Sequence, residues 1–210
     1  MVSMMVEAKP YTEDEQDMLQ EVVNIAIGQA ASSLAKIFDT FVVLSVPQIA
    51  LVGSSTLATS VTSLIGEHEE GIIGVRQAFY NQLCGEAFAI YGRKGCTGLA
   101  EQLGYESEQL DLVDEEVLLD ITNVLVGACL CGVAEQLDRE LSFTAPALCS
   151  GQDSTEELLE LRDHSWTESL LVQTRLGFEG QEFQCHLVIL MAEDTMEELR
   201  LALVDVMELD

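Results

Sequence analysis

The chain has 210 residues, of which 48% are hydrophobic and 22% are charged, so it can bury a sizeable core. Its charge is one-sided, because 37 Asp and Glu residues against 9 Lys and Arg residues give a formal net charge of −28. Such a surface repels phosphate backbones and anionic lipids, which excludes binding to nucleic acid and to membrane surfaces. Solubility or a salt-adapted host is the simplest explanation of the acidity itself.

Neither the cysteines nor the first residues indicate a metal site or an export signal. The six cysteines include no C-x-x-C pair and the three histidines are scattered, so no zinc-type spacing occurs. We interpret the cysteines as small buried residues in a reducing cytosol. The N-terminal segment lacks a signal-peptide pattern, and the most apolar stretch, 124–134, is too short to span a bilayer. The sequence therefore predicts a cytoplasmic protein.

The first half begins with a predicted long helix at about 12–37, where Thr12 and Glu15 form a capping box. Apolar residues recur along it at helical spacing: Met18, Val22, Ile25, Leu34 and Ile37. A β-rich segment at 41–52 contains Pro47, which requires a sheet edge or a strand end. The mixed segment 53–70 has room for a short helix. A hairpin is predicted at 71–82 and 84–92, followed by a short helix at about 96–104.

The second half repeats this order. We expect a helix at about 111–137, a strand at about 141–149, a helical patch within 151–164, strands at 168–178 and 182–191, and a final helix at about 193–207. No strand–helix–strand alternation of the parallel kind occurs. The sequence predicts an α+β fold in which two pseudo-symmetric helix-strand-strand-strand-helix halves form one shared antiparallel or mixed sheet, with the long helices packed against it.

The repetition extends to individual residues at a shift of 99. The coincident pairs include Asn24 and Asn123, Gly28 and Gly127, Ala35 and Ala134, Asp39 and Asp138, Pro47 and Pro146, and Phe79 and Phe178. Two of only three prolines fall in this common register. We therefore expect a single domain, 1–210, with internal repeat halves at about 11–109 and 110–210.

The first long helix carries a narrow polar stripe. Asp17, Glu21 and Asn24 lie at i, i+4 and i+7, which places them within a wedge of about 60° on one helix face. Gly28 follows one turn later. Because glycine costs a helix about 1 kcal/mol relative to alanine, we expect another backbone to approach closely there.

The second long helix repeats the stripe with Glu116, Asp120 and Asn123, so that Asp replaces the middle Glu. Most acidic stripes on helices are simply solvated faces. Asparagines that satisfy the backbone of a neighbouring strand are a second structural explanation. Both explanations stay open beside a functional one.

The stripes and prolines together resemble the CheC/CheX/FliY family of chemotaxis phosphatases. In each half 22 residues separate the asparagine from the proline, Asn24 from Pro47 and Asn123 from Pro146. The segments LQEVVNIAIGQAASSLAKIF and VLSVP also resemble that family's helix and the strand after it. The doubled motif is similar to that of two-site CheC members, so the resemblance covers the whole chain.

The resemblance implies that the chain is a hydrolase of two-component signalling, which dephosphorylates the aspartyl phosphate of a CheY-type response regulator. In that family the glutamate pairs with a lysine of the regulator, and the asparagine enters the regulator's active site and helps to place the attacking water. Carried over, Glu21 and Asn24 form one catalytic site, and Asp120 and Asn123 form the second. Asp120 departs from the expected glutamate, so we expect Asn24 to matter more.

The same resemblance implies supporting roles for Asp17 and Glu116 at the docking face, and for Pro47 and Pro146 beside each site. It implies no metal or cofactor bound by this chain, with Mg²⁺ held by the regulator, and the CheD deamidase as a second partner. The alternative is a non-catalytic protein that binds CheD or resembles a flagellar-switch component. An acidic metal-binding protein is a third possibility, but no EF-hand spacing occurs.

Overall fold

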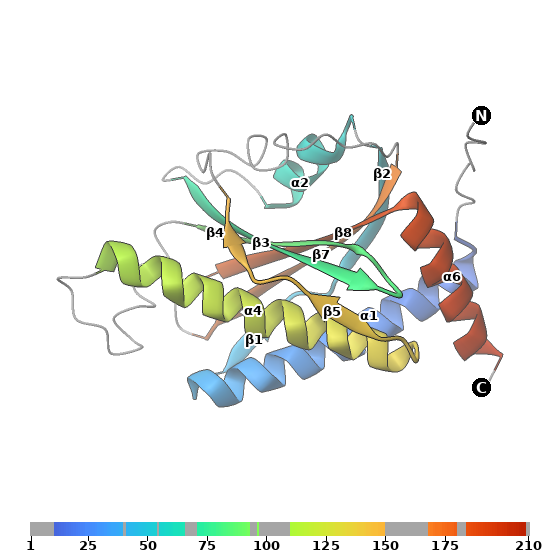
Figure 1. Cartoon of the computed structure of the whole chain (residues 1–210), viewed down its shortest axis with the longest axis horizontal. Helices are drawn as coiled ribbons and strands as arrows, with labels where there is room; N and C mark the ends of the chain where they lie inside the picture. The colour runs from blue at the N-terminus through green and yellow to red at the C-terminus, as the bar shows by residue number, and fades with distance from the viewer. Residues whose placement is uncertain are drawn as a thin grey trace.

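The computed structural model describes residues 11–39, 41–53, 55–65, 71–92, 96, 110–149, 168–179 and 184–208 (Figure 1). Its elements in chain order are α1 (Glu13–Phe38), β1 (Val42–Leu44), β2 (Gln48–Gly53), α2 (Leu57–Ile65), β3 (Ile72–Asn81), β4 (Gly85–Gly92), α4 (Leu110–Gln136), β5 (Leu141–Phe143), β6 (Ala147–Leu148), β7 (Glu168–Phe178), β8 (Gln184–Ala192) and α6 (Glu193–Met207). The predicted helix at 96–104, apart from Cys96, and the predicted patch at 151–164 lie outside the described residues.

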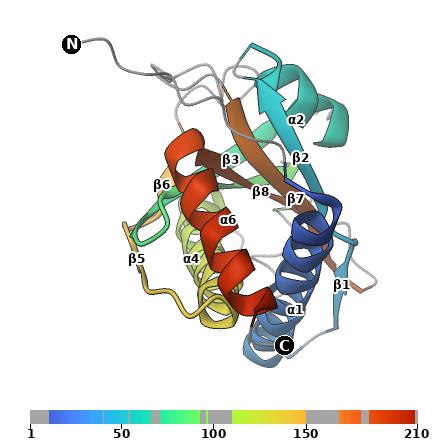
Figure 2. The ribbon, with the colours of Figure 1, turned by 90° about the vertical axis from the view of Figure 1, so that its right-hand side faces the viewer.

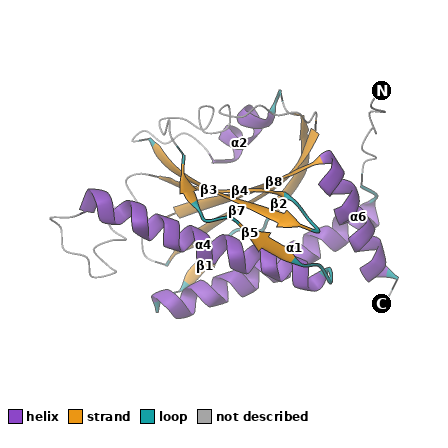
Figure 3. Cartoon of the chain, viewed as in Figure 1, coloured by secondary structure: helices purple, strands orange, loops and turns teal. Residues whose placement is uncertain are grey.

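The strands form one antiparallel sheet to which both halves contribute. Its order is β1-β7-β8-β4-β3-β5, with β2 continuing the β1 edge along β7 and β6 continuing the β5 edge along β3 (Figure 3). Each edge is interrupted where a proline stands, since Pro47 separates β1 from β2 and Pro146 separates β5 from β6. The predicted α+β class and the shared sheet are therefore confirmed.

Equivalent backbone hydrogen bonds recur in the two halves, although not at one constant shift. The amide of Ser45 donates to the carbonyl of Arg175 (2.9 Å), and the amide of Thr144 donates to the carbonyl of Ala78 (3.0 Å). The edge strands are thus related by a shift of 99 (45 to 144), whereas β3 and β7 are related by a shift of 97 (78 to 175). The coincidence of Phe79 with Phe178 is consequently two residues out of register in the sheet.

The helices form two layers on the sheet. α1, α4 and α6 cover one face, and α2 covers the other (Figures 1 and 2). Alternation along each strand sends successive side chains to opposite faces. On β4, Ala87, Ala89 and Tyr91 belong to the large core beneath the three helices, and Phe88 and Ile90 belong to the smaller core beneath α2.

α1 and α4 lie side by side, and their closest approach uses a glycine that the sequence did not single out. A Cβ built on Gly132 lies 3.0 Å from the Cα of Ala26, whereas one built on Gly28 or Gly127 meets nothing within 4 Å. The expectation that another backbone approaches Gly28 is therefore wrong. Two apolar residues expected in the core also face solvent, since Ile25 is 38% exposed and Ile37 is 57% exposed.

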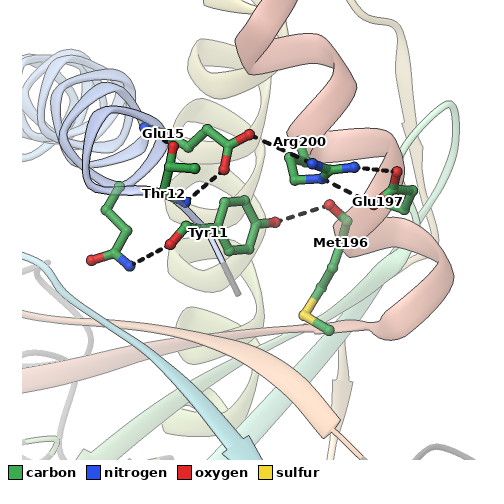
Figure 4. A network of polar contacts seen from close by, with 7 residues as sticks. Tyr11, Thr12, Glu15, Met196, Glu197 and Arg200 are labelled. Atoms are coloured by element: carbon green, nitrogen blue, oxygen red, sulfur yellow. Dashed lines mark hydrogen bonds and ion pairs between the residues drawn. The ribbon is translucent and has the colours of Figure 1, made fainter. Parts of the chain in front are cut away.

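The start of α1 is tied to α6 by a polar network (Figure 4). The predicted capping box is present, with the Glu15 amide donating to Thr12 Oγ1 (3.2 Å) and the Thr12 amide donating to Glu15 Oε2 (2.7 Å). The buried Glu15 carboxylate also lies 3.7 Å from the Arg200 guanidinium, and Tyr11 Oη donates to the carbonyl of Met196 (2.9 Å). These contacts fix α1 against α6 from its first turn.

One helical segment among the described residues, Glu115–Gln136, is long and apolar enough by length and composition to cross a membrane. It exceeds the stretch 124–134 that the sequence drew attention to. In the fold, 61% of its most apolar window is buried against the rest of the protein. Its hydropathy is therefore explained by its place in the core, where it packs against α1 and the sheet.

Candidate functional site

The polar stripe of α1 faces solvent. Asp17, Glu21 and Asn24 are all exposed, because the apolar residues between them turn towards the sheet and α4. Val22 and Val23, which lie between Glu21 and Asn24, are buried in the core. The helix periodicity thus brings the three predicted residues together on one outer face.

The stripe of α4 is arranged in the same way, with Glu116, Asp120 and Asn123 exposed. The residue before the asparagine, Thr122, is fully buried, and its hydroxyl lies 2.8 Å from the hydroxyl of Tyr91 on β4. This buried hydrogen bond fixes the rotation of α4 on the sheet. Asn123, one residue further, is thereby held on the solvent side.

The two prolines lie beside the stripes at opposite edges of the sheet. Pro47 is buried and its carbonyl accepts a hydrogen bond from Gln20 Nε2 of α1 (3.2 Å). Pro146 is half-buried, in the equivalent break between β5 and β6. Because β1 and β5 are the two ends of the strand order, each stripe has its own sheet edge and the two candidate sites are separate.

Two glutamines contact the asparagines, and the motif search did not include them. Gln20 Nε2 lies 3.5 Å from Asn24 Oδ1, and Gln77 Nε2 on β3 lies 2.8 Å from Asn123 Oδ1. Gln77 Nε2 also donates to the carbonyl of Thr144 (2.9 Å). A sequence signal for Gln77 exists, because it is the one polar residue in the alternating series Ile73, Val75, Gln77 and Phe79.

The stripe carboxylates present negative charge outwards. Glu21 and Asp120 are exposed, and the ion pairs between described residues lie elsewhere, at Arg139 with Asp205 and at Arg200 with Glu15 and Glu197. Within the described part of the chain these two carboxylates are therefore available to a cation from outside. An exposed ion pair of this kind contributes about 0–1 kcal/mol, so it selects orientation more than it adds affinity.

The site is a convex helix surface and not a cavity. The apolar gap in the core beneath α1 and α4 is lined by residues such as Leu19, Val23 and Leu199, and no stripe residue contributes to it. Over the ranges that the structure describes, no cluster of three or more His, Cys, Asp or Glu side chains is placed to hold a metal ion.

The fold is that of known chemotaxis and flagellar-switch proteins. FliY of Thermotoga maritima superposes with a TM-score of 0.70 at 17% identity, over 94% of this chain and 100% of that chain. The FliM middle domain of Vibrio alginolyticus gives a TM-score of 0.62 at 9% identity, over 88% and 99%. The chemotaxis protein CheX of Vibrio vulnificus gives 0.54 at 14% identity, over 80% and 97%.

A sequence signature accompanies the fold. The model of the CheC-like family matches residues 15–50, the segment from α1 into β2 that holds Asp17, Glu21, Asn24 and Pro47. The resemblance to the CheC/CheX/FliY proteins is therefore confirmed, without singling out the two-site CheC members. The chain has the fold of these proteins, and it is similar to the CheC-like family in sequence over residues 15–50.

Proposed function

We propose that this chain is a chemotaxis phosphatase that hydrolyses the aspartyl phosphate of a CheY-type response regulator. The observation that carries the proposal is the repeated exposed acid-x-x-Asn stripe, Glu21 with Asn24 and Asp120 with Asn123, each on a helix anchored in the core. An asparagine stands at the same place on both long helices, and a surface residue without a function would not require this repetition. The resemblance of the stripes to those of the CheC/CheX/FliY phosphatases implies the same use of these residues.

In the proposed reaction this chain has to supply only a small part of the chemistry. Water attacks the phosphorus, the bond between phosphorus and the aspartyl oxygen breaks, and a carboxylate and inorganic phosphate are the products. The regulator supplies the phosphoryl group and its Mg²⁺, so the remaining contribution is placing the water, which can be worth several kcal/mol. A neutral carboxamide can enter beside the phosphoryl oxygens, whereas a carboxylate there would be repelled.

Docking is expected to combine one ion pair with local apolar contact. Glu21 and Asp120 are placed to meet a lysine of the regulator. Near Asn24, Ile25 is 38% exposed and Val46, next to Pro47, is 75% exposed. If the regulator is also acidic, long-range attraction is absent, and we then expect binding that is weak and tolerant of salt.

A non-catalytic role is the second candidate function, and the likeness to FliM middle domains favours it. In that case the stripes serve as binding surfaces for a switch component or for a CheD-type deamidase, and the asparagines have no turnover to support. Both roles place the protein in the cytoplasm. They differ in whether the wild type accelerates hydrolysis above the spontaneous rate, and in whether removing the carboxamides returns the rate to the spontaneous value.

The test is the decay of a CheY-type regulator phosphorylated with acetyl phosphate, measured with the wild type, Asn24→Ala, Asn123→Ala and the double variant. We expect acceleration by the wild type, partial loss in each single variant, and the spontaneous rate in the double variant. Lys36→Ala is the matched control, because it removes an exposed side chain from the same helix, twelve residues past Asn24 and outside the stripe. A wild type that leaves the decay unchanged, even with CheD added, would establish the binding role instead.

A further inference from the structure

The side-chain oxygen of each stripe asparagine accepts a hydrogen bond from a glutamine. The same glutamine also donates to a backbone carbonyl at the adjacent edge of the sheet. At the first site Gln20 Nε2 lies 3.5 Å from Asn24 Oδ1 and 3.2 Å from the carbonyl oxygen of Pro47. At the second site Gln77 Nε2 lies 2.8 Å from Asn123 Oδ1 and 2.9 Å from the carbonyl oxygen of Thr144. A carboxamide nitrogen thus bridges the asparagine and a backbone carbonyl in both halves.

The backbone carbonyl fixes which way each carboxamide points. A carbonyl oxygen only accepts, so the glutamine atom that contacts it must be the nitrogen. That nitrogen only donates, so the asparagine atom it meets must be the oxygen. The oxygen of Asn123 is therefore turned inwards to Gln77, and its amino group is left as a donor on the outer side.

The two bridging glutamines do not occupy equivalent positions. The counterpart of Gln20 at a shift of 99 is Leu119, and the counterpart of Gln77 at the shift of 97 between β3 and β7 is Thr174. The hydroxyl of Thr174 donates to the carbonyl of Ser45 (3.0 Å), so it makes the strand contact without a long side chain. The same bridge is thus built twice, from a helix at one site and from a strand at the other.

Gln77 stands where an apolar side chain would serve the core better. It is 1% exposed, lies on the core face of β3 between Val75 and Phe79, and its Oε1 has no hydrogen-bond partner. Leaving a buried polar atom unsatisfied destabilises a fold, which offsets much of the stability that the two hydrogen bonds of the Gln77 nitrogen contribute. An unsatisfied buried oxygen on the residue that donates a hydrogen bond to Asn123 points to a role other than stability.

We propose, on the basis of the proposed phosphatase function, that Gln77 is a positioning residue for Asn123 and that Gln20 is a looser counterpart for Asn24. The shorter contact at the second site holds its carboxamide more firmly in the orientation in which the amino group donates to the phosphoryl group or the water. The second site therefore turns over faster once the regulator is bound, although the first site has the longer anchoring acid. This reverses, for turnover, the expectation that Asn24 matters more.

The experiment isolates the second site with Asn24→Ala and compares it with Asn24→Ala/Gln77→Leu. We expect kcat for dephosphorylation of the CheY-type regulator to fall about 10- to 100-fold, because small misplacements of positioned groups have effects of this size, with KM changed less than twofold. The unfolding midpoint in urea should stay the same or rise, since the unsatisfied oxygen is gone. Gln77→Glu, which keeps the length but lacks the bridging nitrogen, should not restore kcat.

Thr174→Val in the Asn123→Ala background is the matched control, because it changes the equivalent strand position without a contact to Asn24. A second readout needs no catalysis: the side-chain ¹⁵N order parameter of Asn123 should exceed that of Asn24 in the wild type and drop in Gln77→Leu. An unchanged kcat and order parameter in Gln77→Leu would overturn the proposal. If the wild type accelerates nothing, the order parameters still decide the positioning, and only the phosphatase function fails.

Discussion

Gly132 of α4 lies directly on Ala26 of α1, with only 3.0 Å between a Cβ built on the glycine and the Cα of the alanine. The two long helices that carry the stripes therefore touch backbone to backbone at this point. Gln29 Oε1 lies 2.9 Å from the same built Cβ, which closes the remaining space. The relative position of the two stripes depends on this contact.

Alanine at Gly132 should therefore change the free energy of unfolding in the opposite direction to alanine at Gly28 or Gly127. Gly132→Ala is expected to lower the free energy of unfolding by about 1–3 kcal/mol, because overpacking the helix contact exceeds the gain in helix propensity. Gly28→Ala and Gly127→Ala should raise it by about 0.5–1 kcal/mol each, since nothing lies within 4 Å of the added methyl group. Urea denaturation measures all three, and a stabilising Gly132→Ala would show that the helices separate easily.

The hydrogen bond between Thr122 and Tyr91 should make a measurable contribution to stability. Thr122→Val keeps the shape and removes the hydroxyl, so we expect a loss of about 1 kcal/mol, and Tyr91→Phe should cost about 1–2 kcal/mol. In a double-mutant cycle the two changes should couple by about 1 kcal/mol. Thr122→Ser retains the hydroxyl and serves as the control. Additive effects would mean that the two hydroxyls do not interact.

Alkaline pH should lower the free energy of unfolding, because several thiol and phenol groups of the core keep their protons more strongly in the folded state than in the unfolded state. Burial raises the pKa of the Cys129 thiol from 9.0 to about 12, and burial also raises the pKa of Tyr11, Tyr91 and Cys185 above their ordinary values. A raised pKa in the folded state contributes stability below the unfolded-state pKa, and this contribution is lost as the pH rises towards the folded-state value. The free energy of unfolding should therefore fall between about pH 9 and pH 12.

Urea titrations at pH 8, 9.5 and 11 measure this decline. Cys129→Ala should flatten it, whereas Cys131→Ala, which changes an exposed thiol two residues away, should not. In native protein at pH 8, a thiol reagent should label Cys84 and Cys131 readily, because both are exposed. Cys129 should react only after unfolding, since almost none of it is thiolate at that pH. Rapid labelling of Cys129 in the folded protein would contradict its burial in the core.

The anchoring acids should govern binding and not turnover. In the Asn24→Ala background, Asp120→Glu lengthens the second-site acid by one methylene, and we expect KM for the phosphorylated regulator to fall up to about fivefold, the limit for an exposed ion pair. Glu21→Asp in the Asn123→Ala background should raise KM by a similar factor. Glu135→Asp, which shortens an exposed acid near the other end of α4, is the control. A change in kcat without a change in KM would place the acids in the chemical step.

Much of the fold follows from local sequence patterns. The capping box at Thr12 and Glu15 and the alternating strands of the hairpins are short-range signals, and these elements lie close to their predicted bounds. The exposure of Ile25 and Ile37 could not be read from periodicity, because it depends on how far the neighbouring sheet extends. Register shifts are equally non-local, since Phe79 and Phe178 match in sequence while the strands pair two residues apart.

The candidate site was predictable only in part, for a similar reason. A helix face is a local property, so the stripes containing Asn24 and Asn123 could be found from spacing alone. Gln77 lies 46 residues before Asn123, and only the packing of α4 on β3 brings it to the asparagine. The glycine that matters for helix contact, Gly132, was missed because no sequence pattern states which helix lies opposite it.

On the proposed function, the placement of the two stripes at opposite edges of one sheet would give the molecule two separate binding sites for the regulator. Two sites on one folded chain would share a fixed separation. Where regulators are clustered on a larger assembly, the first contact raises the local concentration for the second to the millimolar range, about what a short flexible tether achieves. A phosphatase with two such sites would remove phosphate fastest where its targets are crowded, and its rate would then report their density.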